Sequence, residues 1–318
     1  MPVHWYYDRA ALERDYGRVT EYVAPRSPHP DSILWRSNYT ALNERGNILH
    51  DQAEHWGQKG VHYHQNLHAG ENTLNLQLGR ILLESLREVG GYDADDYLRR
   101  YVEFMLEPGR HRDTYVEECH RNFFTNYARG RAPRQCGEPD IHIGGLAHVG
   151  ILCAWYSENP GAMRAAVLEH VELTHRDAGV LRAADSLCRV LCEVMQGKDL
   201  RVAIRDYASE YFSEKRSRSF QVKPDAAVVA RHFSPACYIK DAFPATLYLA
   251  WKYADDFAAG IIANTNIGGD NCHRGAVLGA LLGAQLGVGG ILPSWVEGLR
   301  SYSLVRDLIV ETPNPKSS

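Results

Sequence analysis

Apolar residues recur at helical spacing along most of the chain after residue 70. The clearest run stops at Gly90-Gly91 and consists of Leu74, Leu78, Ile81, Leu82 and Leu86. Comparable patterns predict further helices over residues 95–107, 114–127, 145–156, 160–174, 178–196, 200–211, 243–258 and 274–286. Runs of alternating strands, Asn-Gly hairpins and a βαβ rhythm are absent from the sequence. We therefore predict an all-α fold.

Other parts of the chain lack this periodicity. Residues 1–60 are rich in Pro, Asn, His and Trp, and we expect an irregular N-terminal segment packed on the core. Short helices are expected in it near residues 8–16 and 37–51. Prolines and glycines predict a loop over residues 130–140, and high charge predicts a mobile loop over residues 213–225. Because no linker interrupts residues 70–300, we assign one helical domain to residues 61–318.

Composition narrows the classes of function. The chain has 318 residues, of which 45% are hydrophobic and 23% charged, as in an ordinary globular protein. The formal net charge of −4 offers no basic footprint for nucleic acid. Residues 276–292 are apolar but contain as much Gly and Ala as larger side chains, so we do not predict a membrane span. The oligomeric state is not indicated.

The cysteines and the start of the chain bear on the compartment. Seven cysteines at irregular spacing, without a CxxC pair, indicate reduced thiols. The first residues show no basic region followed by an apolar stretch, so we do not expect a secretory signal. We therefore predict a cytoplasmic location.

A polar, glycine-containing segment runs directly into the helix predicted at residues 274–286. In this segment, Asn264 to Gly275, either Asp270 or Asn271 is well placed to cap the helix. The helix carries glycines four residues apart, at Gly275, Gly279, Gly283 and Gly287. Each glycine costs about 1 kcal/mol of helix propensity. Close packing must offset this cost, so we expect the helix to lie at the centre of the fold.

Two details of this segment favour a binding site over a simple capped turn. Arg274 stands in the first helical turn, where the helix dipole disfavours a cation and a bound anion would relieve the conflict. The side-chain oxygens of Asn264, Thr265, Asn266, Asp270 and Asn271 also need partners beside a buried helix, and a ligand could provide them.

The segment over residues 262–284 resembles the C-terminal signature of ADP-ribosylglycohydrolases. In that signature a Gly-Asp-Thr-Asp-Thr run opens a small-residue helix, and its acidic residues hold magnesium. Ala69-Gly70-Glu71-Asn72-Thr73 resembles the family's Thr/Ser-Asp-Asp-Thr metal motif, and Leu173-Thr174-His175 is a weaker likeness. The resemblance spans roughly residues 65–290. It implies a compact, single-domain orthogonal bundle of helices.

The departures from the family pattern alter the expected metal chemistry. The matching positions hold only two carboxylates, Glu71 and Asp270, which with amide and water oxygens could bind one Mg²⁺ but not a close pair. Cys272 follows Asp270 as a further candidate ligand. His62, His64 and His68 precede Glu71, so a transition metal is an alternative. The remaining alternative is no metal, with the histidines hydrogen-bonded in a polar cleft.

The resemblance implies a hydrolase that cleaves a glycosidic bond to ADP-ribose or a related ribosyl compound. Glu71 and Asp270 would then act as metal ligands or as the acid/base pair. The expected contacts with the small-molecule or ADP-ribosylated substrate come from His68, Asn72, Asn266, Asn271, His273 and Arg274. The short basic cluster Arg110-His111-Arg112-Asp113 is either a solvated loop or a lip that attracts phosphate.

The departures from the family motifs leave two other interpretations of the function open. The chain could be an enzyme repurposed for another small molecule. It could also be a non-catalytic ligand-binding or crystallin-like protein on the same scaffold.

Overall fold

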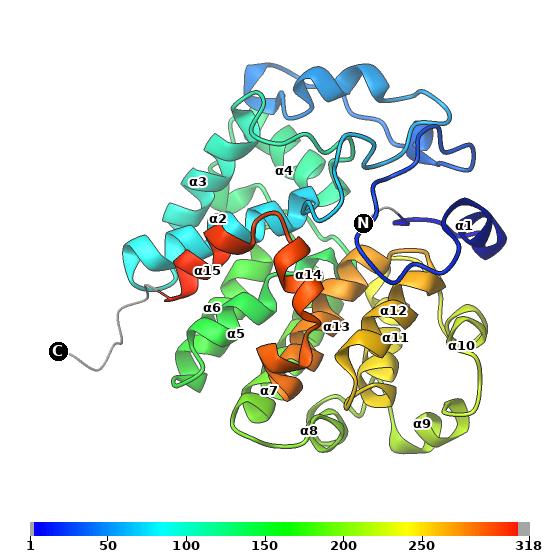
Figure 1. Cartoon of the computed structure of the whole chain (residues 1–318). Coiled ribbons are helices and arrows are strands. Elements are labelled where there is room, and N and C mark those ends of the chain that lie inside the picture. The colour runs from blue at the N-terminus through cyan, green and yellow to red at the C-terminus, as the bar shows by residue number, and fades with distance from the viewer. Residues whose placement is uncertain (1–2, 311–318) are drawn as a thin grey trace.

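The structure, a computed structural model, describes residues 3–310, and its regular elements are helices (Figure 1). The α-helices are α1 Arg9–Tyr16, α2 Leu74–Val89, α3 Ala94–Leu106, α4 Glu118–Ala128, α5 Val149–Trp155, α6 Pro160–Glu172, α7 Ala178–Met195, α8 Leu200–Tyr207, α9 Glu214–Phe220, α10 Asp225–His232, α11 Ile239–Lys252, α12 Phe257–Ile267, α13 Asn271–Leu286, α14 Pro293–Gly298 and α15 Tyr302–Val310. Short 3₁₀ turns are η1 Leu34–Arg36, η2 Glu44–Gly46, η3 His50–His55, η4 Pro133–Gln135, η5 Ile143–Leu146 and η6 Val288–Gly290.

The all-α prediction is confirmed. Within residues 3–310 the β-structure is limited to two isolated bridges, Glu138 with His175 and His142 with Tyr238. None of the helices in this range is long and apolar enough to cross a lipid bilayer. Residues 311–318 of the predicted helical domain lie outside the described range.

Capping chemistry places several helix ends where the sequence predicts them. Gly90 ends α2 in the left-handed conformation at φ 78°, and its amide donates to Leu86. The Asp93 side chain accepts from the amides of Asp95 and Asp96 at the start of α3. Pro160 occupies the first turn of α6. These local rules set the ends of α2, α3 and α6 to within a residue or two.

Three predicted segments differ from the structure. Residues 243–258 belong to two helices, because Asp256 caps α12 through the amide of Ala259 and interrupts the pattern. Residues 37–51 hold 3₁₀ turns in place of a helix. Residues 213–225 contain helix α9 where we expected a loop. Phe220 anchors this helix by packing against Tyr248, with ring centroids 5.7 Å apart.

The N-terminal segment runs along the outside of the helical body and meets the start of α13 (Figure 1). The Trp5 amide donates to the Gly269 carbonyl at 2.7 Å, and the Gly269 amide donates to the Tyr6 carbonyl at 2.8 Å. Val3 and Tyr6 are fully buried in a small apolar cluster of their own. This segment therefore docks on the glycine turn that precedes α13.

Helix α13 lies at the centre of the fold, as predicted, in contact with α5, α7, α11 and α12. Its glycines, however, do not form the expected close-packed ridge. A Cβ at Gly275 would lie 3.0 Å from Asn264 Nδ2, whereas one at Gly279 has its nearest neighbour at 4.0 Å and one at Gly283 has none within 4 Å. Close packing therefore accounts for Gly275 alone, and Gly279 leaves open space beside the helix.

Candidate functional site

A cavity of about 500 Å³ lies where the two family-like segments meet. Its walls come from the start of α2, from α12 and α13, and from the C-terminal helices α14 and α15. The lining is polar at one part of the wall, at His68, Glu71, Asn72, Thr73, Asn264, Thr265 and Cys272. Aromatic and aliphatic side chains such as Phe257, Ile261 and Trp295 make up much of the remainder. Gly275 and Gly279 also line this cavity, which explains the open space beside Gly279.

Glu71 presents an ionised carboxylate at the cavity wall. Its Oε2 accepts from the His68 amide at 2.9 Å, and Arg112 Nη2 donates to both carboxylate oxygens at 2.9 and 3.0 Å. Burial raises the pKa of Glu71, but the His68 amide and the Arg112 charge outweigh it, so the pKa falls below its usual value. Arg112 thus serves as the partner of Glu71.

The residues after Glu71 join the first motif to other parts of the chain. Asn72 Nδ2 donates to Ser301 Oγ at 3.1 Å and thereby ties the motif to the C-terminal segment. Thr73 Oγ1 lies 3.4 Å from Cys272 Sγ, so the two family-like segments are in direct contact. Gly70 adopts φ +76°, and a Cβ there would lie 2.0 Å from the Gly298 carbonyl oxygen.

The loop of the second motif is shorter than the sequence predicted. Residues 264–267 form the last turn of α12, and only Gly268-Gly269-Asp270 makes the turn into α13. Gly268 and Gly269 have φ values of +77° and +63°, and a Cβ at either would lie about 2 Å from a backbone carbonyl oxygen. Asp270 Oδ1 accepts from the His273 amide at 3.3 Å, which confirms Asp270 as the helix cap.

Arg274 and Asn266, both expected to contact substrate, hold protein segments together. Arg274 is fully buried and donates to Asn264 Oδ1 at 2.7 Å, to the Gly268 carbonyl at 2.8 Å and to the Pro235 carbonyl at 3.3 Å. Protein oxygens therefore compensate the cation in this first turn without a bound anion. Asn266 exchanges two hydrogen bonds with the Val19 backbone, at 2.9 and 2.8 Å.

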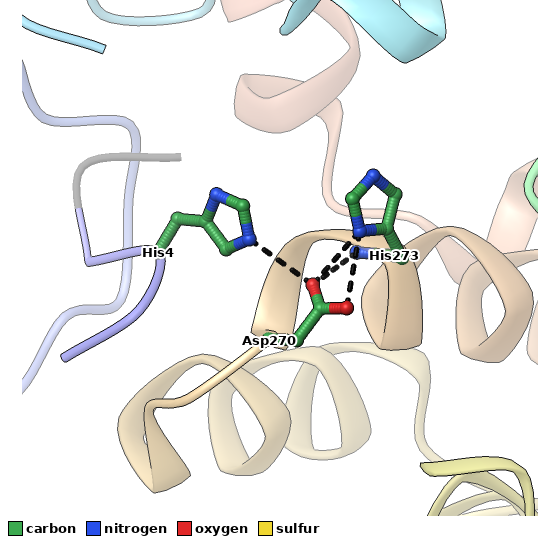
Figure 2. Close-up of side chains that lie close together, drawn as sticks. All are labelled: His4, Asp270 and His273. Atoms are coloured by element: carbon green, nitrogen blue, oxygen red, sulfur yellow. Dashed lines mark hydrogen bonds and ion pairs between the residues drawn. The ribbon is translucent and has the colours of Figure 1, made fainter. Parts of the chain in front are cut away.

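A buried chain of hydrogen-bonded carboxylates and imidazoles runs through Asp270. Figure 2 shows its central part, with His4 and His273 on either side of Asp270. In spatial order it is formed by Asp113, His64, His4, Asp270, His273 and Glu117. Consecutive members lie within hydrogen-bond distance, from 2.5 Å between Asp113 Oδ1 and His64 Nδ1 to 3.1 Å between His4 Nε2 and Asp270 Oδ1. His273 lies between two carboxylates, with Nδ1 2.9 Å from Asp270 Oδ1 and Nε2 2.9 Å from Glu117 Oε1.

Burial and neighbouring charge decide the protonation of this chain. Burial opposes the charge of His273, yet Asp270 and Glu117 outweigh it and raise the His273 pKa well above its usual value. Burial also opposes ionisation of Asp270 and Glu117. The His273 charge prevails at both, so the Asp270 pKa lies well below normal and the Glu117 pKa falls to about 2. His273 is therefore a cation between two anions.

Burial favours the uncharged forms of Asp113, His64 and His4 in the other half of this hydrogen-bonded chain. Burial lowers the pKa of His4 and His64 and raises that of Asp113 to about 7. One arrangement of protons then satisfies each contact. The Asp113 carboxyl donates to His64 Nδ1, His64 Nε2 donates to His4 Nδ1, and His4 Nε2 donates to Asp270. The Leu74 amide donates to the second Asp113 oxygen at 2.8 Å, so the chain also holds the start of α2.

Three members of this chain escaped the sequence analysis. His4 lies in a segment without periodicity, Asp113 closes a basic cluster that looked solvated, and Glu117 lay inside a predicted helix that in fact begins at residue 118. Asp113 is only 1% exposed. The available signal was the position of His62, His64 and His68 just before Glu71, which indicated imidazoles near the motif but not their partners.

Comparisons with known proteins agree with the all-helical fold. The sequence profile of the ADP-ribosylglycohydrolase family matches residues 1–316. The chain therefore belongs to this family of glycosyl hydrolases. A solved structure described as an ADP-ribosylglycohydrolase-related protein complex is 25% identical, covers 76% of this chain and 81% of its own, and superposes with a TM-score of 0.58. No curated protein matches the sequence at a significant level.

The magnesium typical of the family does not fit the residues at the two motifs. Glu71 is paired with Arg112, and Asp270 accepts from His4 and His273. Of the neighbouring side chains, only Asn271 Oδ1 is a buried oxygen without a partner, and its amide nitrogen already donates to the Val3 and Thr265 carbonyls. Mg²⁺ requires oxygen ligands with compensating negative charge, but Arg112 already balances the charge of Glu71, and the imidazoles of His4 and His273 surround the carboxylate of Asp270.

Imidazole, thiol and carboxylate donors gather in three groups that suit other metals, one of them at Asp270 itself. Among residues 3–310, three groups bring their donor atoms within 4.8 Å of one another: His4 with Asp270 and His273, Glu117 with Cys119 and His120, and Cys119 with Asp140 and His175. None of these three groups contains Glu71 or Cys272, the other predicted metal ligands. The side chains of this protein that could bind a metal therefore do not coincide with Glu71 and Cys272, two of the ligands predicted from the family motifs.

Proposed function

We propose that this protein hydrolyses the glycosidic bond of a neutral ribosyl compound in the cavity between α2 and α13. The observation that carries the proposal is the convergence of both family-like motifs on one cavity. Glu71, Asn72 and Thr73 line it from one motif and Cys272 from the other. Oxygen-rich groups at one part of the wall suit ribose hydroxyls. The apolar remainder suits a base or another flat aglycone.

The charge of the lining favours a neutral substrate over ADP-ribose itself. The lining residues, all within the described range, include the carboxylates Glu21 and Glu71 but no Lys or Arg. A pyrophosphate in such a cavity would lose hydration without gaining a compensating cation. Arg274, the cation predicted to meet an anionic group, is fully buried against protein oxygens.

In this proposal Glu71 is the catalytic carboxylate. As an ionised group at the wall it accepts a proton from the attacking water or stabilises the positive charge that develops on the ribose ring. His68 and Asn72 contact the sugar hydroxyls. Asp270 is a positioning residue, because it caps α13 and thereby places Cys272 opposite Thr73.

The test is a turnover assay with purine and pyrimidine nucleosides, O-acetyl-ADP-ribose and an ADP-ribosylated peptide, each with Mg²⁺ and with a chelator. We expect release of ribose from a neutral compound, without dependence on Mg²⁺. Glu71→Gln should lower kcat by about 10²–10⁴-fold. Glu21→Gln, which changes the other carboxylate of the lining, is the matched control and should change kcat little.

Absence of turnover with every compound would contradict the proposal, as would activity confined to ADP-ribosyl substrates in the presence of Mg²⁺. Equal activity of Glu71→Gln and the parent protein would remove Glu71 from the catalytic role.

The altered motifs also favour a second candidate, a non-catalytic ligand-binding or crystallin-like protein on this scaffold. Cys272 replaces a carboxylate, and the Glu71 carboxylate is already paired with Arg112. Titration calorimetry with ADP-ribose and with nucleosides separates the candidates, because binding without turnover supports this one. Turnover of a small molecule other than a riboside would instead indicate a repurposed enzyme.

A further inference from the structure

A second buried cluster of potential metal-ligating side chains lies away from the cavity lining. Cys119 and His120 belong to the first turn of α4, Asp140 precedes η5, and His175 follows α6. The four residues are between 3% and 6% exposed. They come from three segments, and the isolated bridge between Glu138 and His175 joins two of these, the one with Asp140 and the one with His175.

Cys119 is common to two groups of donors. Its Sγ lies within 4.8 Å of the Asp140 carboxylate and a His175 ring nitrogen, and within the same distance of donors on Glu117 and His120. A single ion bound to the Cys119 sulfur could therefore take ligands from both groups. Thiolate, imidazole and carboxylate together form a donor set typical of zinc and not of magnesium.

The two imidazoles are oriented as metal-bound histidines usually are. His120 Nδ1 pairs with Tyr101 Oη at 2.8 Å, whereas its Nε2 is buried and has no hydrogen-bond partner. His175 Nδ1 pairs with Thr174 Oγ1 at 2.9 Å, and its Nε2 faces Asp140 Oδ1 at 3.6 Å, beyond hydrogen-bond distance. In each ring an outer hydrogen bond fixes one nitrogen and leaves Nε2 for the cluster.

The imidazoles of the hydrogen-bonded chain through Asp270 differ from those of this cluster in their hydrogen bonding. Both ring nitrogens of His4 and both of His273 have hydrogen-bond partners at 2.7–3.1 Å, so that chain is satisfied by protein groups alone. The cluster around Cys119 instead leaves the buried Nε2 of His120 without a hydrogen-bond partner, which is unfavourable if nothing binds it. A metal ion would provide the missing partner.

We propose that Cys119, Asp140 and His175 bind one zinc-type transition-metal ion, with the fourth ligand from His120 Nε2 or Glu117. On binding, the Cys119 thiol loses its proton to solvent and the thiolate coordinates the ion. The ion joins the start of α4, the segment before η5 and the end of α6, so its role is structural. The proposal does not depend on the glycosidase activity, and either can fail without the other.

Metal analysis and cobalt substitution of the full-length protein test the proposal. We expect about one zinc ion per chain after purification, or after addition of zinc to chelator-treated protein. Replacement of zinc by Co²⁺ should give the thiolate-to-cobalt charge-transfer band and the intense visible bands of a tetrahedral site. Cys119→Ser should remove the charge-transfer band and weaken metal binding by roughly tenfold or more, and His175→Asn should weaken binding similarly.

Cys136→Ser is the matched control, because Cys136 is also buried but its Sγ donates to the Arg131 and Ala132 carbonyls and belongs to none of the three donor groups. This variant should retain the metal and the charge-transfer band. Failure of the parent protein to bind Zn²⁺ or Co²⁺ overturns the proposal without recourse to any variant. A cobalt complex without a thiolate band would also overturn it, as would equal loss of metal in Cys136→Ser and Cys119→Ser.

Discussion

Asp270 is the residue at which the family pattern and the structure of this chain diverge most clearly. It keeps an acidic position of the family signature, yet its carboxylate accepts from His4 and His273, and the second acidic position holds Cys272. Its neighbours therefore stabilise the negative charge through imidazoles, and its ionisation requires no metal. The predictions for single residues therefore concern the hydrogen bonds and protonation states of the buried carboxylates and imidazoles around Asp270.

Removal of His4 should destabilise the protein. His4→Ala leaves Asp270 and His64 each without one buried partner, so we expect a loss of about 1–3 kcal/mol in the free energy of unfolding. Urea denaturation followed by circular dichroism measures the change. His55→Ala serves as the control, because the His55 side chain is partly exposed and its ion pair is with Glu54. We expect the free energy of unfolding of this variant to change by no more than about 0.5 kcal/mol. Equal stability of the two variants would contradict the role of His4.

Asp113 should make stability depend on pH. Burial raises its pKa to about 7, whereas in the unfolded chain the pKa is near 3.8, so between these values the folded state holds the proton more tightly. The unfolded state then binds fewer protons, and this contribution to stability falls as pH rises through the window and stays lost above it. Above about pH 7 the ionised carboxylate also no longer donates to His64.

Asp113→Asn tests this dependence, because an amide keeps a donor for His64 and an acceptor for the Leu74 amide at every pH. We expect the variant to match the parent protein at about pH 5 and to be more stable at about pH 8 in urea unfolding. Asp113→Ala, which lacks both groups, should be less stable at both values. Parallel pH profiles of Asp113→Asn and the parent protein would refute the assignment of a raised pKa.

At the scale of secondary-structure elements, the turn that leads into α13 has no room for side chains, whereas the helix itself has room beside some of its glycines. Gly268 and Gly269 form its entry turn, at conformations and distances that exclude a side chain. Gly279 and Gly283 further along have no neighbour closer than 4.0 Å. The same residue type therefore serves different purposes on one helix, and substitution should separate them.

Alanine at Gly268 and at Gly283 should have opposite effects. Gly268→Ala places a Cβ 2.2 Å from the Tyr6 carbonyl oxygen at φ +77°, so we expect a loss of at least about 1–3 kcal/mol in unfolding free energy. Gly283→Ala adds a methyl group in open space within a helix and should stabilise by up to about 1 kcal/mol. Urea unfolding of both variants checks the signs. Destabilisation by Gly283→Ala would show that this glycine is closely packed after all.

At the scale of the whole molecule, the C-terminal helices close the cavity. Trp295 of α14 and Tyr302 of α15 line it, and the Arg300 amide donates to the Gly70 carbonyl at 2.9 Å beside the first motif. Helix α15 lies along α2 (Figure 1). The cavity is therefore formed by both ends of the region that resembles the family, roughly residues 65–290, together with the C-terminal helices that follow it.

A chain that ends after Leu292 should keep its helical core but lose ligand binding. The truncation removes α14 and α15, whereas the buried core of α2–α8 and α11–α13 remains. We expect far-UV circular dichroism reduced only by the missing helices and ligand affinity lowered roughly tenfold or more, because one apolar wall is absent. A chain that ends after Val310 keeps α15 and is the control. Unchanged affinity of the shorter chain would place the binding site elsewhere.

Much of the fold was predictable from the sequence because helices obey local rules. Periodicity placed α2, α3, α6 and α7 to within a residue or two, and the caps at Asp93 and Gly90 follow from neighbouring residues alone. Helix α9 was missed because a single apolar residue, Phe220, anchors it to a distant helix. Local patterns carry no record of such a contact.

The candidate site divides in the same way. The sequence by itself determined the family, the all-α class and the two motifs that line the cavity, and it narrowed the cap of α13 to Asp270 or Asn271, since each depends on residues close together in the chain. Only the tertiary structure decided that His4, Asp113 and Glu117 join this region and that Arg274 is buried. It also decided the charges, because the pKa values of Asp113 and His273 depend on burial and on partners far away in the sequence.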